Sequence, residues 1–194
     1  GLSWQWQLSG SVNTGYPVDV YDLDLFDTPA ATSADLKAAG RKVVCYFSAG
    51  SWEEWRDDAD QFPVSVLGNT LDGWEDEKWL DISSPQVLTI MKSRLDLAAT
   101  KGCDAVEPDN VDGYSNNNGL DLSAADQLSY NQAIASAAHE RQLAVGLKND
   151  LDQVAALQHW FDFAVNEQCH EYQECEVLQV FSDNNKAVFS AAYE

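Results

Sequence analysis

Four acidic residues lie close together in the stretch GCDAVEPDNVDGY, which covers positions 102–114. They are Asp104, Glu107, Asp109 and Asp112, and no Lys or Arg stands among them. Crowded carboxyl groups raise one another's pKa, which keeps one of them protonated and able to donate a proton near neutral pH. With a second carboxylate across a cleft, such an acid can hydrolyse a glycosidic bond, because one group protonates the leaving oxygen while the other attacks or activates water.

A second candidate carboxyl group is Glu167, which closely follows the apolar run FDFAV. Side chains alternate along a strand, so Glu107 and Asp109 lie on one side if their strand continues past Pro108. Glu167 lies on the same side of its strand as alternate apolar residues of the run FDFAV. The side chains of Glu107 and Asp109, and that of Glu167, can therefore point towards one common axis between the strands. Asp104 has the opposite parity and is interpreted as structural.

The elements that must position these residues alternate between short β-like runs and helical stretches, which predicts βα units and a parallel sheet. Eight such strands predict a (β/α)₈ TIM-like barrel, whose reactive face lies at the carboxyl ends of its strands. The alternative is a doubly wound open sheet. No Gly-rich turn follows the first strand, so nothing supports a nucleotide site. The predicted strands cover 4–8, 18–26, 42–48, 79–82, 103–107, 143–147, 161–165 and 187–193.

Three helices are predicted between these strands. The clearest covers 85–100, with Ser84 as its N-cap and Pro85 at its first position. A second begins at Ser123, where Asp126 gives a short-armed capping box, and runs to about 139. A shorter helix covers 33–40.

The chain of 194 residues shows no repeat or linker, which favours one domain over 1–194. It stops at Glu194, directly after the eighth predicted strand, so either the last helix is missing or the barrel closes without it. The sequence begins without a basic region and an apolar stretch, so a signal peptide has been removed or never existed. No apolar run is long enough to predict a membrane span.

The composition is strongly acidic, with 32 Asp and Glu against 11 Lys and Arg and a formal net charge of −21. Such a field repels nucleic acid and anionic membrane surfaces and attracts cations, although solubility alone is a sufficient explanation. We therefore expect no nucleic-acid partner. A cationic ligand is the functional interpretation.

The four cysteines fall into two groups. Cys169 and Cys175 can close a small loop by a disulfide, whereas Cys45 and Cys103 lie in strand-like runs and are either bonded or buried free thiols. An even number of cysteines fits secretion. The three His residues have no zinc-site spacing, and the acidic stretch fails the pattern of a calcium loop, so we expect neither a metal nor a cofactor.

Five segments in this order resemble glycoside hydrolase family 114, the endo-α-1,4-polygalactosaminidases: VVCYFSAGSWEEWR, WLDI, KGCDAVEPDNVDGY, GLKND and FDFAVNEQC. The resemblance runs from about Trp4 to Glu194 and implies a secreted (β/α)₈ enzyme that makes endo cuts in α-1,4-linked, galactosamine-rich polysaccharide. It also implies that the acids of the PDN and NEQC motifs, Asp109 and Glu167, form the catalytic pair. We assign Asp109 as nucleophile and Glu167 as acid/base, and the exchanged assignment stays open.

The resemblance further implies a set of groove-lining residues, to which we add Glu107 because it crowds the site. A cation among these acids, Lys148, would pair with a carboxylate and fix its charged state. None of the seven Trp residues can be assigned to core or groove, and the stretch SWEEWRDDADQ is assigned no chemistry. The resemblance-based groove residues are Asp22, Asp24, Tyr46, Asp112, Tyr114, Lys148 and Asn149.

The expected substrate accounts for the charge, since free amino groups on galactosamine are cationic and acids attract them. A free amine cannot act as the nucleophile that a 2-acetamido group supplies, so retention requires a protein nucleophile. The competing hypothesis is a barrel that binds cationic polysaccharide without cutting it. A barrel acting on a neutral sugar leaves the acidity unexplained. We expect a monomer.

Overall fold

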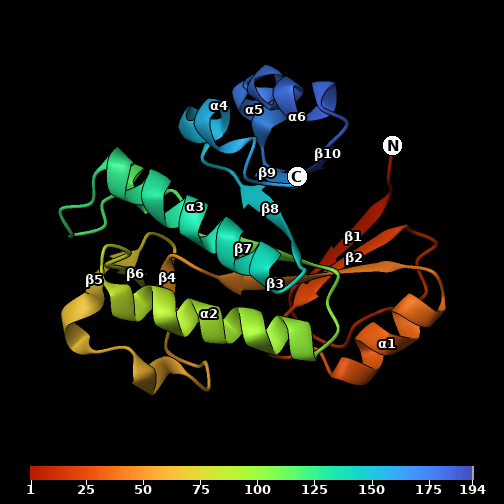
Figure 1. Ribbon diagram of the computed structural model, residues 1–194, viewed down its shortest axis with the longest axis horizontal. Helices are drawn as coiled ribbons and strands as arrows, with labels where there is room; N and C mark the ends of the chain where they lie inside the picture. Colours follow the sequence, from red (N-terminus) through yellow and green to blue (C-terminus); the bar gives the residue numbers. More distant parts are fainter. Residues whose placement is uncertain (194) are drawn as a thin grey trace.

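Seven parallel strands form the main sheet of the computed structural model, which describes residues 1–193 (Figure 1). The strand order β1-β2-β3-β7-β8-β9-β10 follows the chain without reversal, whereas a doubly wound sheet reverses its order. The first and last strands meet, because the rings of Trp4 in β1 and Phe189 in β10 lie 5.1 Å apart. The sheet is therefore a nearly closed TIM-like barrel, as predicted, with fewer helices than a full set of eight.

The boundary between β1 and β10, which we call the seam, carries no ladder of backbone hydrogen bonds among residues 1–193. Side chains close it instead. The strands are β1 Trp4–Gln7, β2 Val20–Asp24, β3 Lys42–Ser48, β4 Ser51–Glu53, β5 Leu67–Leu71, β6 Trp74–Leu80, β7 Ala105–Asp109, β8 Ala144–Lys148, β9 Phe163–Glu167 and β10 Ala187–Ala191. The helices are α1 Ala30–Ala38, α2 Pro85–Thr100, α3 Ala124–Glu140, α4 Val154–Leu157, α5 Cys169–Tyr172 and α6 Gln179–Asp183, with 3₁₀ turns at Ala59–Gln61, Val64–Val66, Gly113–Ser115, Leu151–Gln153 and Cys175–Leu178.

The predicted strand at 79–82 is wrong as a barrel strand. Its first two residues end β6, which pairs antiparallel with β4 and β5 in a separate three-stranded sheet. Trp79 and Leu80 are buried there, as their apolar character predicts. An apolar run does not show whether its strand belongs to the barrel or to the three-stranded sheet. The described chain therefore has seven barrel strands and not eight.

The two long helices agree with the sequence. α2 begins at Pro85, and α3 begins after Ser123, whose side chain accepts from the Asp126 N–H while the Asp126 carboxylate accepts from the Ser123 N–H. Figure 1 shows α2 and α3 lying side by side across the outer face of the sheet, and they pack against each other. Within the described part of the chain, no helix is both long and apolar enough to cross a membrane.

The barrel interior changes from apolar to charged along its axis. Beyond the apolar positions, the same inward faces carry acids and a lysine at the carboxyl ends of the strands, because the side-chain period is two. Gly146 in β8 leaves room for this packing, since a Cβ there would lie 2.3 Å from the Phe163 ring. The apolar interior cluster is Val20, Val44, Ala105, Phe163, Val165 and Phe189.

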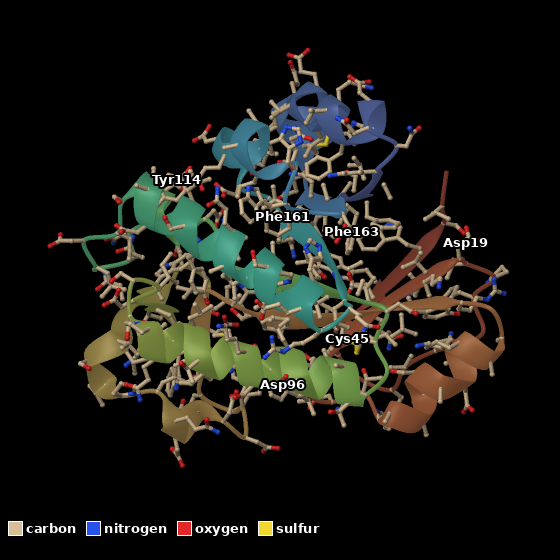
Figure 2. The ribbon with its side chains drawn as sticks, viewed as in Figure 1. Asp19, Cys45, Asp96, Tyr114, Phe161 and Phe163 are labelled. Carbon is tan, nitrogen blue, oxygen red and sulfur yellow. A yellow bond between two sulfur atoms is a disulfide. The ribbon has the colours of Figure 1, made fainter. Side chains whose placement is uncertain are left out.

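Both cysteine pairs are disulfides. The predicted bond between Cys169 and Cys175 is confirmed. Cys45 in β3 is bonded to Cys103 before β7, which settles the alternative left open by the sequence (Figure 2). This second bond joins β3 to the segment that leads into the neighbouring strand β7, across 58 residues of sequence.

Candidate active site

Lys148 brings the two predicted catalytic carboxylates together. Its Nζ lies 3.3 Å from Asp109 Oδ2 and 3.4 Å from Glu167 Oε2. Each of these three residues is the last of its strand: Asp109 ends β7, Lys148 ends β8 and Glu167 ends β9. The two carboxylates therefore lie at the same mouth of the barrel, and the pairing expected of Lys148 is present.

A buried carboxylate holds Lys148 from below. Glu107 is 0% exposed and its Oε1 lies 2.6 Å from Lys148 Nζ, while its Oε2 accepts from Trp6 Nε1 at 3.1 Å. Burial opposes the charge on Lys148, but the three surrounding carboxylates outweigh it and raise the pKa of this lysine well above its usual value. The ammonium group is therefore a fixed positive charge at the centre of the site.

Asp22 lies deeper, beside Glu107, and is 1% exposed. Burial and the Glu107 charge raise the pKa of Asp22 well above its usual range, and burial also raises the pKa of Glu107. A neutral Asp22 carboxyl group costs less to bury than a carboxylate beside another carboxylate. Neither Asp22 nor Glu107 lines a cavity described below. Glu107 contacts Lys148 directly from the barrel interior, and Asp22 lies beside Glu107.

Further hydrogen bonds orient the two candidate catalytic groups. Asp109 Oδ2 accepts from the Tyr46 hydroxyl at 3.0 Å, and its Oδ1 accepts from the Asn110 N–H at 2.7 Å. Glu167 Oε2 accepts from Asn149 Nδ2 at 3.2 Å, and its Oε1 accepts from the Tyr193 hydroxyl. Burial and the Asp109 carboxylate raise the pKa of Tyr46 well above its usual value, so this hydroxyl remains a donor.

The backbone fixes Asp109 as well. The Asp109 carbonyl accepts from the N–H groups of Ala49 and Gly50 at 2.9 and 3.1 Å. A Cβ at Gly50 would lie 1.6 Å from the Asn110 carbonyl oxygen, so only glycine permits this approach of β3 to β7.

The shared contact with Lys148 limits the separation of the two carboxylates. Asp109 Oδ2 and Glu167 Oε2 can be no further apart than the sum of their distances to Lys148 Nζ, which is 6.7 Å. Retaining glycosidases hold their carboxyl groups about 5–5.5 Å apart and inverting ones about 6.5–9.5 Å. This limit on one pair of oxygen atoms admits the retaining separation and also the lower part of the inverting range.

A large cleft of about 1200 Å³ opens above Asp109 and Glu167. Its aromatic lining includes Trp55 and Trp74, which are 53% and 63% exposed. Among the described lining residues Arg56 is the one basic side chain, and Asp24 and Glu53 bind its guanidinium. The acids that line this main cleft are Asp24, Asp27, Glu53, Asp72, Glu75, Glu77, Asp109, Asp112 and Glu167.

Several residues of the main cleft were missed by the sequence analysis. Trp55 and Arg56 belong to the stretch 51–61, which was assigned no chemistry, and Glu77 precedes the misplaced fourth strand. Burial raises the pKa of Glu77 to about 7, and its Oε2 accepts from the Ser51 hydroxyl at 2.7 Å. No local pattern marks them, because their partners in the site come from distant strands.

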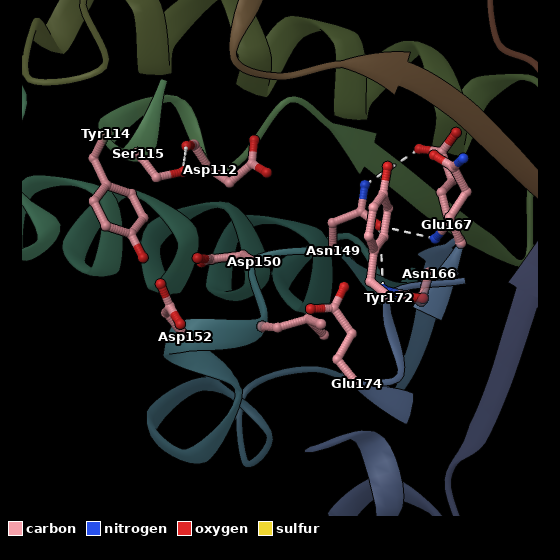
Figure 3. A pocket seen from close by; sticks show the side chains of 12 residues that line it. Asp112, Tyr114, Ser115, Asn149, Asp150, Asp152, Asn166, Glu167, Tyr172 and Glu174 are labelled. Atoms are coloured by element: carbon pink, nitrogen blue, oxygen red, sulfur yellow. Dashed lines mark hydrogen bonds between the residues drawn. The ribbon is translucent and has the colours of Figure 1, made fainter. Parts of the chain in front are cut away.

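A smaller pocket of about 370 Å³ adjoins the main cleft on the Glu167 side (Figure 3). We call it the side pocket, and it shares Asp112, Asn149 and Glu167 with the main cleft. Asn149 and Asp150 both have positive φ, of 49°, so the chain turns sharply after β8 and presents consecutive polar side chains here. The lining is Asp112, Tyr114, Ser115, Asn149, Asp150, Leu151, Asp152, Asn166, Glu167, Gln168, Tyr172 and Glu174.

The predicted site residues occupy three levels. Asp22, Glu107 and Lys148 are buried inside the barrel mouth. Asp24 and Tyr46 line the main cleft, and Tyr114 lines the side pocket. Asp109, Glu167, Asp112 and Asn149 lie at or near the junction of the two cavities.

A parallel barrel with two carboxyl groups under an open cleft, at the carboxyl ends of its strands, has the arrangement of a glycoside hydrolase. Residues 1–194 match the profile of glycoside hydrolase family GH114. The chain belongs to this family and is a glycoside hydrolase, in agreement with the sequence motifs.

The solved structures that are similar to this chain include the following two. The crystal structure of Aspergillus fumigatus Ega3 in complex with galactosamine has a TM-score of 0.98 at 50% identity, and the match covers 100% of this chain and 77% of that one. The glycoside hydrolase domain of PelA from Pseudomonas aeruginosa has a TM-score of 0.75 at 12% identity, covering 99% and 83%, and supports the fold alone. A comparison with curated protein sequences gave no significant match.

Proposed function

We propose that this enzyme makes internal cuts in α-1,4-linked, galactosamine-rich polysaccharide, with Asp109 and Glu167 as its catalytic pair. The observation that carries the proposal is the contact of both carboxylates with one ammonium group, beneath an open cleft lined by acids. A cleft of about 1200 Å³ has room for an internal segment of a polymer. The galactosamine complex of the 50% identical Ega3 supports the sugar class.

In the proposed mechanism Asp109 is the nucleophile and Glu167 is the acid/base. Tyr46 and Lys148 both lie within reach of Asp109 Oδ2, which aims that carboxylate at a fixed point over the barrel mouth. Glu167 is the more exposed of the two side chains and donates its proton to the leaving oxygen, then takes one from water. The 6.7 Å limit is compatible with the retention of configuration that we propose.

The acidic lining supports a cationic substrate. Exposed indoles of Trp55 and Trp74 can stack on sugar rings, while the carboxylates attract protonated amines. We further propose that residues 1–194 act as one monomeric, secreted domain, which the two disulfides support because such bonds persist in oxidising compartments. Light scattering and the protein's mass before and after thiol labelling test both points.

The decisive experiment follows chain length of partly deacetylated polygalactosamine incubated with the wild type, Asp109→Asn and Glu167→Gln. We expect the wild type to shorten the polymer and each variant to lose about 10²–10⁴-fold in rate, since each lacks one proton-transfer or attacking group. The exposed acids Asp121 and Glu140 supply matched controls, Asp121→Asn and Glu140→Gln, which should keep full activity. NMR of the first product should show the α anomer.

The competing function is binding without cleavage. A wild-type protein that binds the polymer but never shortens it would establish that function and refute ours. A β anomer as first product would leave the pair in place but show inversion.

A further inference from the structure

A buried network of hydrogen bonds connects the small sheet to the loop that follows Asp109. Glu77 in β6 accepts from the Ser51 hydroxyl at 2.7 Å, and Ser51 in β4 contacts the hydroxyl of Ser48, the last residue of β3, at 2.5 Å. The side-chain amide of Asn110, the first residue after β7, donates to Ser48 Oγ at 2.8 Å and to Ser51 Oγ at 3.2 Å. The network therefore runs from a buried carboxyl group to the residue that follows the proposed nucleophile.

Glu77 fixes the direction of these hydrogen bonds. The Ser51 hydroxyl has one proton and donates it to Glu77, so the Ser48 hydroxyl is the donor in the contact between the two serines. Ser48 Oγ is then left as an acceptor, and it accepts from the Ser51 N–H at 3.1 Å and from Asn110 Nδ2 at 2.8 Å. The side-chain donors therefore all point from Asn110 towards Glu77.

The burial of the network makes its end group important. Ser48 and Ser51 are each 0% exposed, and Glu77 is 8% exposed. If the Glu77 carboxyl group is removed, the Ser51 hydroxyl loses its acceptor and turns its proton towards Ser48 Oγ. That proton competes with the Asn110 amide for the same oxygen lone pairs. The anchor of Asn110 is thereby weakened.

Asn110 needs an anchor because its backbone conformation is unfavourable. Its φ is 57°, in the left-handed region, which costs free energy for a residue with a Cβ and persists where surrounding contacts enforce it. In this conformation the Asn110 N–H donates to Asp109 Oδ1 at 2.7 Å, while Oδ2 of the same carboxylate contacts Tyr46 and Lys148. If the Asn110 contact is lost, one carboxylate oxygen of the proposed nucleophile is released and the carboxylate plane can turn.

We propose that Glu77 is a positioning residue for the hydrolysis: through the two buried serines it holds Asn110, and thereby the Asp109 carboxylate, in the orientation required for attack. This inference rests on the proposed function and deepens it. Glu77 also lines the main cleft, so the alternative role is a direct contact with the sugar. The two roles differ in the kinetic constant that they affect and in their dependence on Ser51.

Steady-state kinetics of the full chain on partly deacetylated polygalactosamine test the proposal. We expect Glu77→Ala to lower kcat about 10–100-fold and to change KM by less than about twofold, because a misdirected nucleophile slows the chemical step. The control Asp76→Ala removes an exposed acid of the same strand that is not among the described residues lining the main cleft, and it should keep full kcat. Glu77→Gln should recover most of the loss, since its amide oxygen can accept from the Ser51 hydroxyl.

A double-variant cycle tests whether Glu77 acts through the serine. Ser51→Ala alone should lower kcat by a similar factor, and Glu77→Ala/Ser51→Ala should be no slower than the slower single variant, because both changes break one network. Effects that multiply in the double variant would overturn the proposal. A Glu77→Ala protein whose loss lies in KM would also overturn it, because that pattern identifies a direct contact with substrate.

The backbone amide proton of Asn110 gives a readout that does not depend on activity. Its hydrogen bond to a carboxylate moves the proton resonance downfield and slows its exchange with solvent. We expect Glu77→Ala to move this resonance upfield and to speed the exchange about tenfold or more, and Asp76→Ala to change neither. Ser51→Ala should reproduce the change, which keeps the test valid if the Glu77→Ala protein is unstable. An unchanged Asn110 resonance in both variants contradicts the proposal.

The outcomes for Glu77 and for the enzyme are distinguishable. If the wild type shortens the polymer while Glu77→Ala keeps full kcat, the positioning role fails and the proposed function stands. If the Asn110 resonance moves as expected but the wild type leaves the polymer intact, Glu77 orients Asp109 and the proposed hydrolysis fails.

Discussion

Lys148 is the residue on which the charge balance of the site depends. It is 1% exposed and contacts Glu107, Asp109 and Glu167 within 2.6–3.4 Å. Its Nζ also lies 4.8 Å from the centre of the Trp6 ring and 5.6 Å from the centre of the Tyr46 ring. A buried cation with this many partners fixes three carboxylates at once.

We predict that Lys148→Met destabilises the fold by about 3–5 kcal/mol, because it leaves Glu107 buried without its counter-charge. Urea denaturation measures the loss. The exposed Lys92 provides the control, Lys92→Met, which should change stability by less than about 0.5 kcal/mol. The double variant Lys148→Met/Glu107→Gln should recover much of the loss, and a double variant as unstable as the single one contradicts this explanation.

At this scale the sequence predicted part of the site. The two-residue period placed Glu107 and Asp109 on one inward face, and β7 does continue through Pro108. The place of Trp74 in the main cleft depends on loops that come together only in three dimensions, so it could not be predicted from spacing.

Two disulfides constrain different elements. The bond from Cys45 to Cys103 spans 58 residues and joins β3 to the segment before β7, whereas the bond from Cys169 to Cys175 spans 6 and closes one loop around α5. In the chain-entropy description, a longer closed loop removes more freedom from the unfolded chain.

We therefore predict unequal costs for removing the two bonds. The Cys45→Ala/Cys103→Ala variant should lose about 4 kcal/mol and the Cys169→Ala/Cys175→Ala variant about 2 kcal/mol. Urea denaturation of both variants under non-reducing conditions checks the difference. Equal losses would show that native packing, rather than loop closure, sets the value of these bonds.

Element existence was more predictable than element topology. The capping residues of α2 and α3 and seven strand positions could be located because periodicity and caps are local signals. The small sheet of β4, β6 and β5 could not be predicted in this way. The sequence of β6 has the same apolar pattern as a barrel strand, although β6 pairs antiparallel with its neighbours.

The whole molecule combines a net charge of −21 with several buried acids of raised pKa. Burial raises the pKa of Asp112 to about 6, of Glu77 to about 7 and of Asp150 to about 8. Each group binds its proton more tightly in the folded protein than in the unfolded chain, where its pKa is near 4. At a pH between the unfolded pKa and the folded pKa of such a group, the folded protein binds more protons than the unfolded chain. The free energy of unfolding therefore falls as the pH rises through this interval.

We predict that the free energy of unfolding decreases from pH 5 to pH 8. Self-repulsion of the net negative charge acts in the same direction. Urea denaturation across this range measures the slope, and Asp150→Asn should flatten it while Asp121→Asn should not. A stability that rises over this interval would show that other groups dominate the titration.

The seam between β1 and β10 has a consequence for local motion. The strand edges that face it carry no ladder pairing within residues 1–193, and the Trp4 and Phe189 rings bridge it. Amide hydrogen exchange should therefore be fastest in β1 and β10 and slowest in β3 and β7, which have paired strands on both sides. Trp4→Ala should speed exchange in β10 with little effect in β7. The barrel then opens repeatedly at one place, by sub-global fluctuations, without crossing its unfolding barrier.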